Sequence, residues 1–526
     1  MRLPKIRKMT KLKQFGKDCA DFIIFCILVF CFFAAMSFIL NKRMIYRIYL
    51  PGGKWNDEVF YYKQIESVIH YGFPRGFFGY NESHADLLTF GSWSPFLLLP
   101  YVIGGKLIGW NYFTPVLLNL FMFACALYMF LKVTGCTIKK QLCIYAVFMA
   151  SGGIFRYVLS GMTEPVIFSV VLIAISLVCR KVNGSEEIKS RFEIWVILGI
   201  CFFSTLMRPY LLVLFLYPIC FSAKQKRKGE IIGAVLLSVI GILIYFWISN
   251  HICAPYYTPI IDLSFLDVMK EDGLFAGLGV IFTRCYNGGI SIKNFLAGMF
   301  AERKTEYGKS YLFFFLELIF LVVLFLKDLK RKGWKDSLQI IRAVTIGIFI
   351  SIFGAILIFY DVRMGGRHLF VCVILGTIVL FFDAGRKYSI AVAAVMCICG
   401  LIFRLDKAEI PYRSTDTISW IKESEEILQK YVKLNPDTGD YWDNTVAYEL
   451  GVSYNVLYGM PSGIGIQLDF TSYLLEMKEP VKSKYLIVVP GGELSKRLSE
   501  LNATLLGRTG SFELFLNPEV PLYKAE

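Results

Sequence analysis

Residues 20–40 read ADFIIFCILVFCFFAAMSFIL, an apolar run long enough to cross a membrane as a single helix. Seven lysines and arginines precede it in residues 1–17, so the positive-inside rule places this end in the cytoplasm and directs the helix outward. The run is longer than the apolar part of a signal peptide and lacks a small-residue cleavage site. We therefore expect it to be retained as the first membrane span.

The composition of the whole chain is that of a membrane protein. Of 526 residues, 56% are hydrophobic and 18% are charged, whereas a soluble protein carries about 25% charged residues. The net charge of +15 comes from short basic clusters between apolar runs, which indicates membrane topology and anionic lipid rather than nucleic acid as a partner. Most of the 14 cysteines act as small apolar side chains. Cys253 and Cys285 share an outer loop, where a disulfide is possible.

Eleven membrane spans are expected within residues 1–403, which places the C-terminus outside. Charge decides the count, because the basic loops all lie in the cytoplasm only if residues 93–110 do not cross. That segment is short and contains Pro95, Pro100 and Lys106, so we interpret it as lying along the outer leaflet. The spans after the first are expected at 112–132, 141–158, 164–180, 192–207, 210–223, 230–250, 311–327, 339–360, 368–383 and 388–403.

Residues 404–526 have the composition of a soluble domain, which we expect on the outer side as a small α/β fold. The patterns predict helices at 418–431 and 493–501, a strand and turn at 485–492, and strands at 503–507 and 512–516. Two long outer loops, 41–92 and 251–310, belong to the membrane domain. The second is expected to be a lid or a solvated face.

Two adjacent carboxylates lie in the first outer loop, in the stretch Trp55-Asn56-Asp57-Glu58-Val59-Phe60-Tyr61-Tyr62. Burial among aromatic residues and mutual repulsion would raise the pKa of one of them. A carboxylate in this position can act as a general base toward an acceptor hydroxyl or amine. Alternatively, Asn56 or Asp57 caps a helix, and both roles are compatible. We interpret Asp57 as the candidate base and Glu58 as a helper or a helix first-turn residue.

Further ionisable residues are expected on the same outer face. Glu164 begins a span, where it is either a first-turn acid or a site residue. Arginine is disfavoured on the outer side of a membrane, so Arg208, Arg363 and Arg367 require an explanation. Two of them, Arg363 and Arg367, flank a Gly-Gly turn beside His368. There the guanidinium groups either bind a phosphate or snorkel from helix ends.

Acids and cations on one face of a membrane body suit glycosyl transfer from a lipid-phosphate donor, because the acid deprotonates the acceptor and the cations hold the leaving phosphate. The sequence also resembles the GT-C superfamily of integral-membrane glycosyltransferases, in particular the branch with protein O-mannosyltransferases and bacterial aminoarabinose transferases. The resemblance is carried by Asp57-Glu58 with Tyr61-Tyr62, by Ser94-Pro95-Phe96, by Glu164-Pro165, by Leu206-Met207-Arg208-Pro209 and by Arg367-His368-Leu369.

The resemblance implies a multi-pass plasma-membrane enzyme that moves a hexosyl or pentosyl group, with inversion, from a polyprenyl-phosphate donor to a cell-envelope glycan, lipid or polymer. It implies catalytic roles for acidic residues and contacts to substrate or lipid phosphate for the others. The acidic set is Asp57, Glu58 and Glu164, and the contact set is Arg208, Arg363, Arg367, His368, Tyr61 and Tyr62. No cofactor is certain. A divalent cation stays open, because Trp93-Ser94-Pro95 replaces the His-Pro-Pro that is frequent in the family.

Three other functions are compatible with such a chain: a polysaccharide polymerase, a lipid-glycan flippase or transporter, and a non-enzymatic scaffold. A transporter would carry charges deep in its spans and paired broken helices, whereas Glu317 is one of few mid-span charges here. The adjacent acids and the C-terminal domain favour a transferase over a polymerase. Binding of a donor lipid would separate the enzymes from a scaffold.

Overall fold

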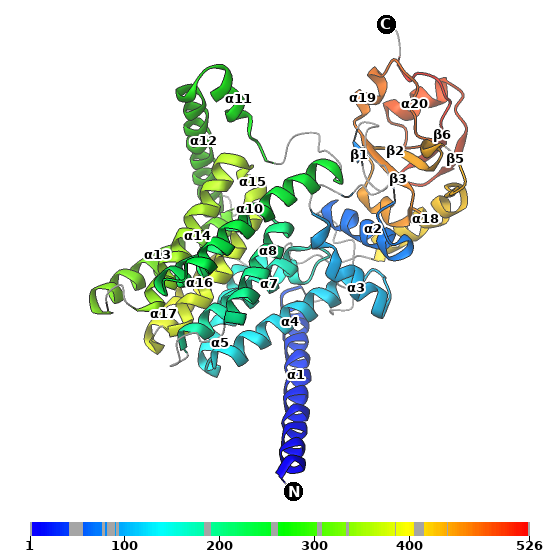
Figure 1. The fold of residues 1–526 in the computed structure, drawn as a ribbon. Coiled ribbons are helices and arrows are strands. Elements are labelled where there is room, and N and C mark those ends of the chain that lie inside the picture. The colour runs from blue at the N-terminus through cyan, green and yellow to red at the C-terminus, as the bar shows by residue number, and fades with distance from the viewer. Residues whose placement is uncertain are drawn as a thin grey trace.

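The computed structural model describes residues 3–41, 56–75, 79–80, 90, 94–183, 191–253, 261–301, 308–332, 336–383, 385–403, 415–438 and 440–523. Helices dominate the chain up to residue 402, and a small α/β domain lies at the C-terminal end (Figure 1). The helices of the first part are α1 (Leu3–Asn41), α2 (Asn56–Tyr71), η2 (Pro95–Leu97), α3 (Leu99–Ile108), α4 (Thr114–Thr134), α5 (Ile138–Ser151), α6 (Gly153–Val158), α7 (Glu164–Asn183), α8 (Arg191–Met207), η3 (Pro209–Phe215), α9 (Leu216–Lys224), α10 (Lys228–His251), α11 (Ser264–Glu271), α12 (Leu274–Ala301), α13 (Gly308–Lys332), α14 (Ser337–Phe359), α15 (Val362–Gly365), η4 (Gly366–His368), α16 (Leu369–Asp383) and α17 (Arg386–Ile402).

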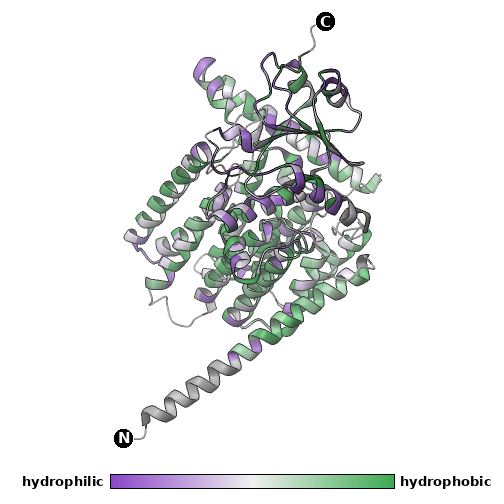
Figure 2. Ribbon diagram, turned by 90° about the vertical axis from the view of Figure 1, so that its right-hand side faces the viewer, coloured by the Kyte–Doolittle hydropathy of each residue, from purple (hydrophilic) through white to green (hydrophobic). Residues whose placement is uncertain are grey.

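The helical part is an apolar body of the kind expected from the sequence. Within the described residues, five helical stretches are long and apolar enough to cross a membrane alone, against the eleven spans expected. They are Asp18–Ile39, Thr114–Thr134, Lys228–His251, Ser337–Phe359 and Val362–Phe382. Shorter apolar helices cover Pro95–Ile108, Phe192–Met207, Pro209–Lys224 and Lys387–Ile402. Hydrophobic residues colour most of this body in Figure 2, and hydrophilic ones gather toward helix ends.

The centre of the body is α16, whose sequence LFVCVILGTIVLFFD is apolar on every side. A helix without a polar face is stable only when neighbours surround it, and α16 packs against α5, α7, α13 and α14. Its side chains from Leu369 to Phe381 are almost all buried. This packing fixes the turn that precedes α16, which carries Arg367.

Two expectations about local structure require correction. Residues 251–310, expected as an outer loop, are not a plain loop, because their described part forms α11 and the 28-residue helix α12, joined where Gly273 adopts a φ of 93°. Arg284 of α12 donates to the carbonyl oxygens of Asp262 and Ile358 at 3.0 and 2.9 Å, which fastens this pair of helices to the end of α14. The expected span 141–158 is broken by Gly152, whose φ of 69° separates α5 from α6.

The C-terminal domain contains a six-stranded mixed sheet in the order β1-β3-β2-β4-β6-β5. Strands β1 to β4 run parallel, and β6 and β5 are antiparallel to their neighbours. The strands are β1 (Gly79–Tyr80), β2 (Thr445–Glu449), β3 (Gly465–Asp469), β4 (Tyr485–Val488), β5 (Leu505–Arg508) and β6 (Glu513–Leu516), and the helices are α18 (Thr415–Tyr431), η6 (Tyr441–Asn444), η7 (Tyr454–Gly459), α19 (Thr471–Glu476) and α20 (Glu493–Glu500). The small α/β fold is confirmed, and its edge strand β1 comes from the segment 41–92, which lies far earlier in the sequence.

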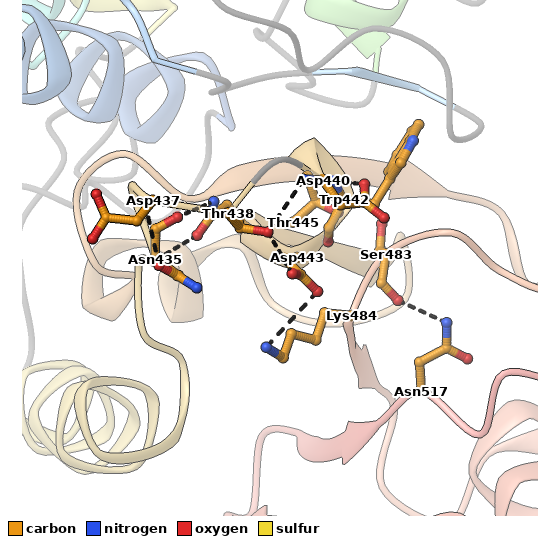
Figure 3. Close-up of polar contacts among 11 residues, drawn as sticks. Asn435, Asp437, Thr438, Asp440, Trp442, Asp443, Thr445, Ser483, Lys484 and Asn517 are labelled. Atoms are coloured by element: carbon orange, nitrogen blue, oxygen red, sulfur yellow. Dashed lines mark hydrogen bonds and ion pairs between the residues drawn. The ribbon is translucent and has the colours of Figure 1, made fainter.

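Polar contacts fix the chain that enters β2 (Figure 3). Thr438 donates its hydroxyl to Asp443 at 2.7 Å, and Lys484 at the start of β4 lies 3.9 Å from the same carboxylate. Asn517, after β6, donates to the carbonyl oxygen of Ser483 at 2.9 Å. These contacts tie the ends of three strands together. Elsewhere, Cys253 and Cys285 are both free thiols, so the disulfide considered from the sequence is not formed.

Candidate active site

Helix α2 carries the acidic stretch and lies between the helical body and the C-terminal sheet (Figure 1). Acidic side chains in its first turn suit the positive end of the helix dipole, so Asp57 and Glu58 favour the helix start that the sequence predicts. Tyr61 packs into the core of the membrane body, whereas Phe60 and Tyr62 pack into the core of the C-terminal domain. The helix therefore belongs to both parts of the molecule.

Glu164 lies at the start of α7, where it is 2% exposed. The turn before it is held by Asn119 of α4, whose side-chain amide donates to the carbonyl oxygens of Ser160 and Met162 at 2.6 and 3.1 Å. Tyr101 of α3 donates its hydroxyl to Asn119 at 2.5 Å and also reaches the carbonyl of Met162. The network fixes the position of Glu164 from two neighbouring helices.

Two arginines reach the acidic residues from other elements. Arg208 is the residue before η3, and the following Pro209 favours its extended backbone. Arg367 lies in η4, which begins at Gly366 directly after Gly365, the last residue of α15. A Cβ atom on Gly365 would lie 2.4 Å from Ile356, and one on Gly366 would lie 2.7 Å from the Ser310 hydroxyl oxygen. Both glycines are therefore needed for the turn to lie close against α13 and α14.

These four ionisable groups form one cluster although they are far apart in sequence. Arg367 Nη1 lies 2.6 Å from Asp57 Oδ2 and 3.9 Å from Glu164 Oε1. Arg208 Nη2 lies 3.6 Å from the same Glu164 oxygen, and the Arg208 side chain is completely buried. Arg367 is 15% and Asp57 22% exposed. The pair Arg208–Glu164 is thus protected from solvent, whereas solvent or a substrate can reach the pair Arg367–Asp57.

Tyr61 lies one helical turn after Asp57 and is 5% exposed. Its burial raises the pKa of its hydroxyl to about 12, with Arg208 acting in the opposite direction and Asp57 in the same direction. Within the described part of the chain, the hydroxyl has no hydrogen-bond partner. It is therefore a protonated donor beside the ionic cluster.

The other predicted site residues take different positions. His368 is buried, with its ring centroid 4.9 Å from Tyr210 and 5.3 Å from Tyr360. Arg363 is exposed, and its backbone N–H donates to Asp361 at 2.5 Å. Glu58 is fully buried in α2. The ion pairs described above join Asp57 and Glu164 to Arg367 and Arg208.

Tyr62 lies in an aromatic group that joins α2 to the C-terminal domain rather than beside Asp57. Its ring centroid lies 5.2 Å from Trp110, 5.6 Å from Tyr112 and 5.3 Å from Tyr458. Spacing could have separated the two tyrosines, because positions 57 and 61 share one helix face and positions 58 and 62 share another. The sequence interpretation also missed Tyr101 and Asn119, which carry no motif of their own.

A divalent cation such as Mg²⁺ or Ca²⁺ needs several oxygen ligands in one place. Within the described ranges, no group of three or more His, Cys, Asp or Glu side chains could hold a metal ion. Asp57 and Glu164 supply oxygen ligands, but Arg367 and Arg208 lie against them. The cluster as folded is an arginine–carboxylate site.

No family model matches the sequence, and no curated protein sequence matches it. Solved structures do match. The crystal structure of ArnT from Cupriavidus metallidurans bound to undecaprenyl phosphate superposes with a TM-score of 0.50 at 11% identity, covering 96% of this chain and 99% of that one. The Archaeoglobus fulgidus oligosaccharyltransferase, in complex with Zn and sulfate, has a TM-score of 0.47 at 12% identity, covering 93% and 73%. The chain therefore shares the fold of this ArnT structure, and a fold of this kind is what the sequence resemblance implied.

Proposed function

We propose that this protein is a glycosyltransferase that moves a sugar from a polyprenyl-phosphate donor to a cell-envelope glycan, lipid or polymer. One observation carries the proposal: Asp57 and Glu164 meet Arg367 and Arg208 in a single, largely buried cluster. Carboxylates and guanidinium groups in one site can serve an acceptor and a phosphate leaving group together. The ArnT structure with a matching fold holds undecaprenyl phosphate, which agrees with a lipid phosphate as donor.

Asp57 is the proposed general base. Its carboxylate takes the proton of the acceptor hydroxyl or amine while the acceptor atom bonds to the anomeric carbon. The bond from that carbon to the phosphate oxygen breaks on the opposite face, which inverts the anomeric centre. The electron pair leaves with the oxygen, and the carrier departs as a polyprenyl phosphate with one additional negative charge.

Arg367 is the proposed link between the two ends of this reaction. As Asp57 accepts the proton it loses its charge, and its ion pair with Arg367 weakens. At the same moment the leaving phosphate gains a negative charge, which the freed guanidinium can bind. Arg208 adds a second positive charge behind it, and the protonated Tyr61 hydroxyl can donate to a phosphate oxygen. No charge has to be left unpaired during the transfer.

The proposed topology has eleven spans, a cytoplasmic N-terminus and the site with the C-terminal domain on the extracytoplasmic face. One part of this proposal, that the site and the domain share a side, is supported by the packing of α2, which carries Asp57, into the C-terminal domain. Site and domain therefore lie at the same end of the helical body. The exposed stripe Leu99, Ile103 and Leu107 on α3 provides an apolar surface along which a lipid could approach from the outer leaflet.

Purified protein in detergent, supplied with a panel of polyprenyl-phosphate sugars and envelope acceptors, tests the proposal. We expect Asp57→Asn to lower transfer by about 100-fold or more, the usual range for loss of a general base. Asp361→Asn is the matched control, because this exposed residue caps α15 and asparagine caps equally well. Equal turnover by Asp57→Asn and wild type would remove Asp57 as the base. If the wild-type protein neither binds nor uses any donor, the proposed transferase function is excluded.

A further inference from the structure

Arg367 lies between two carboxylates in a position that a divalent cation could take in a site of this chemistry. Its Nη1 atom is 2.6 Å from Asp57 and 3.9 Å from Glu164, and Arg208 lies 3.6 Å from Glu164 on the other side. Two carboxylates therefore face two guanidinium groups. The formal charge that a divalent ion would supply between these acids is already supplied by the protein.

The geometry does not favour adding a metal to this arrangement. Mg²⁺ requires oxygen ligands at about 2.0–2.1 Å in nearly octahedral order, and Ca²⁺ requires six to eight at about 2.3–2.6 Å. Asp57 Oδ2 already accepts a charge-assisted hydrogen bond from Arg367. His368, the histidine next in the chain, is packed between the rings of Tyr210 and Tyr360. A metal ion would have to displace Arg367 and then lie beside the buried charge of Arg208.

We propose that Arg367, supported by Arg208, performs in this chain the electrostatic role of a divalent cation. The fixed guanidinium balances the charge of Asp57 and Glu164 and receives the donor phosphate. This inference rests on the proposed function for its catalytic part. The part that concerns occupation of the site by arginine instead of metal stands on the ion pairs alone.

The shape of guanidinium explains why arginine suits this place. Arginine has five N–H donors in a planar fork and can contact a carboxylate and a phosphate at once, whereas lysine is a point charge. Arg367 Nη1 is directed at Asp57 and Glu164, and the side chain is 15% exposed. The exposed part of its guanidinium group can therefore meet a ligand that enters from the open side of the cluster. Arg208, which is fully buried, has no such access and acts by charge.

The test uses full-length protein in detergent and two independent readouts. Isothermal titration with Mg²⁺, Mn²⁺ and Zn²⁺ should show no stoichiometric binding at the wild-type site. Arg367→Ala should gain a divalent-cation site that is lost again in Arg367→Ala with Asp57→Asn. Arg331→Ala is the control, because Arg331 is 70% exposed and its ion pair with Asp328 lies at the far end of α13. Wild-type protein that binds one divalent ion in an Asp57-dependent way would overturn the inference.

The second readout is transfer activity. Chelators should leave wild-type transfer unchanged, and Arg367→Ala should lower it about 100-fold, the scale for removal of one preorganised charge donor. Added guanidinium ion should restore part of that loss. Arg367→Lys, which keeps the charge and the ion pair, guards against misfolding and should retain more activity than Arg367→Ala. Loss of wild-type transfer on chelation, reversed by added metal, would refute the inference even if the transferase is confirmed. If no donor is used, the titration still decides the question of the metal.

Discussion

Replacing Gly463 with alanine should loosen helix α2 from a distance, because the C-terminal domain holds this helix. Gly463 lies between η7 and β3 with a φ of 88°, and an added Cβ would lie 2.9 Å from a ring carbon of Tyr71 and 3.0 Å from its hydroxyl oxygen. Tyr71 is the last residue of α2 and donates to the carbonyl oxygen of Ser462 at 3.0 Å. The substitution therefore disturbs both the backbone of the domain and the end of the helix.

The size of the effect follows from two contributions. A non-glycine residue with a left-handed backbone costs about 1–2 kcal/mol, and loss of the Tyr71 hydrogen bond costs about 1 kcal/mol. Together they make about 2–3 kcal/mol. Amide hydrogens of α2 exchange when the helix opens locally, and the substitution lowers the free energy of that opening by about 2–3 kcal/mol. Their exchange should therefore become roughly 30- to 150-fold faster, at about 1.4 kcal/mol for each tenfold change.

Hydrogen exchange followed by mass spectrometry measures this directly. Peptides from α2 should exchange faster in Gly463→Ala, and peptides from α14 should not change. Gly510→Ala is the control within the same domain, because a Cβ there meets nothing within 4 Å and its φ is not positive. Unchanged exchange in α2, with the variant folded, would show that the domain does not hold the helix.

Two further predictions concern single side chains. Arg342→Met should destabilise the protein by about 3–5 kcal/mol, because Arg342 is fully buried and its Nη1 lies 2.7 Å from the nearly buried Asp328. Adding Asp328→Asn should recover part of this stability. Thermal unfolding in detergent measures both effects. Tyr61→Phe should weaken donor binding by roughly 10- to 100-fold, the value of about 1.5–3 kcal/mol for a hydrogen bond to a charged group. That loss should be the same from pH 6 to pH 9, because a folded pKa of about 12 keeps the hydroxyl protonated throughout. If the weakening of donor binding by Tyr61→Phe varies between pH 6 and pH 9, the hydroxyl is excluded as the hydrogen-bond donor.

The helical body could be predicted from the sequence because its signal is local. Long apolar runs require helices in a membrane whatever their neighbours are, and the expected spans coincide with helices such as α4, α8, α10 and α14. Two strands of the C-terminal sheet could not be predicted in this way. Strand β3 reads Gly465-Ile466-Gln467-Leu468-Asp469, with a buried glutamine and aspartate, and β1 is only two residues long. Their pairing depends on neighbours distant in sequence, so no local pattern indicates them.

The same distinction applies to the candidate site. The sequence indicated Asp57, Glu164, Arg208 and Arg367 one at a time, from charges at positions where a membrane protein disfavours them. It could not indicate that Arg367 meets Asp57 across 310 positions of sequence, because that contact depends on how α16 packs and on the close approach allowed by Gly365 and Gly366. Tyr101 and Asn119 escaped for the same reason. Their side chains donate three hydrogen bonds to the carbonyl oxygens of Ser160 and Met162, just before Glu164. No local sequence pattern indicates such contacts.

The position of α2 has a consequence for how the two parts of the protein depend on each other. Asp57 and Tyr61 face the membrane body, while Phe60 and Tyr62 are core residues of the C-terminal domain. Lys63 of the same helix is buried and donates to the carbonyl oxygen of Met460 at 2.6 Å. A movement of the domain therefore moves the candidate base relative to Arg367, whose own turn is fixed by the membrane body. A change of 1 Å in this distance alters a charge-assisted hydrogen bond substantially. An acceptor that contacts the domain could thus act on the site without touching it, and removal of the domain should abolish transfer while the helical body remains folded.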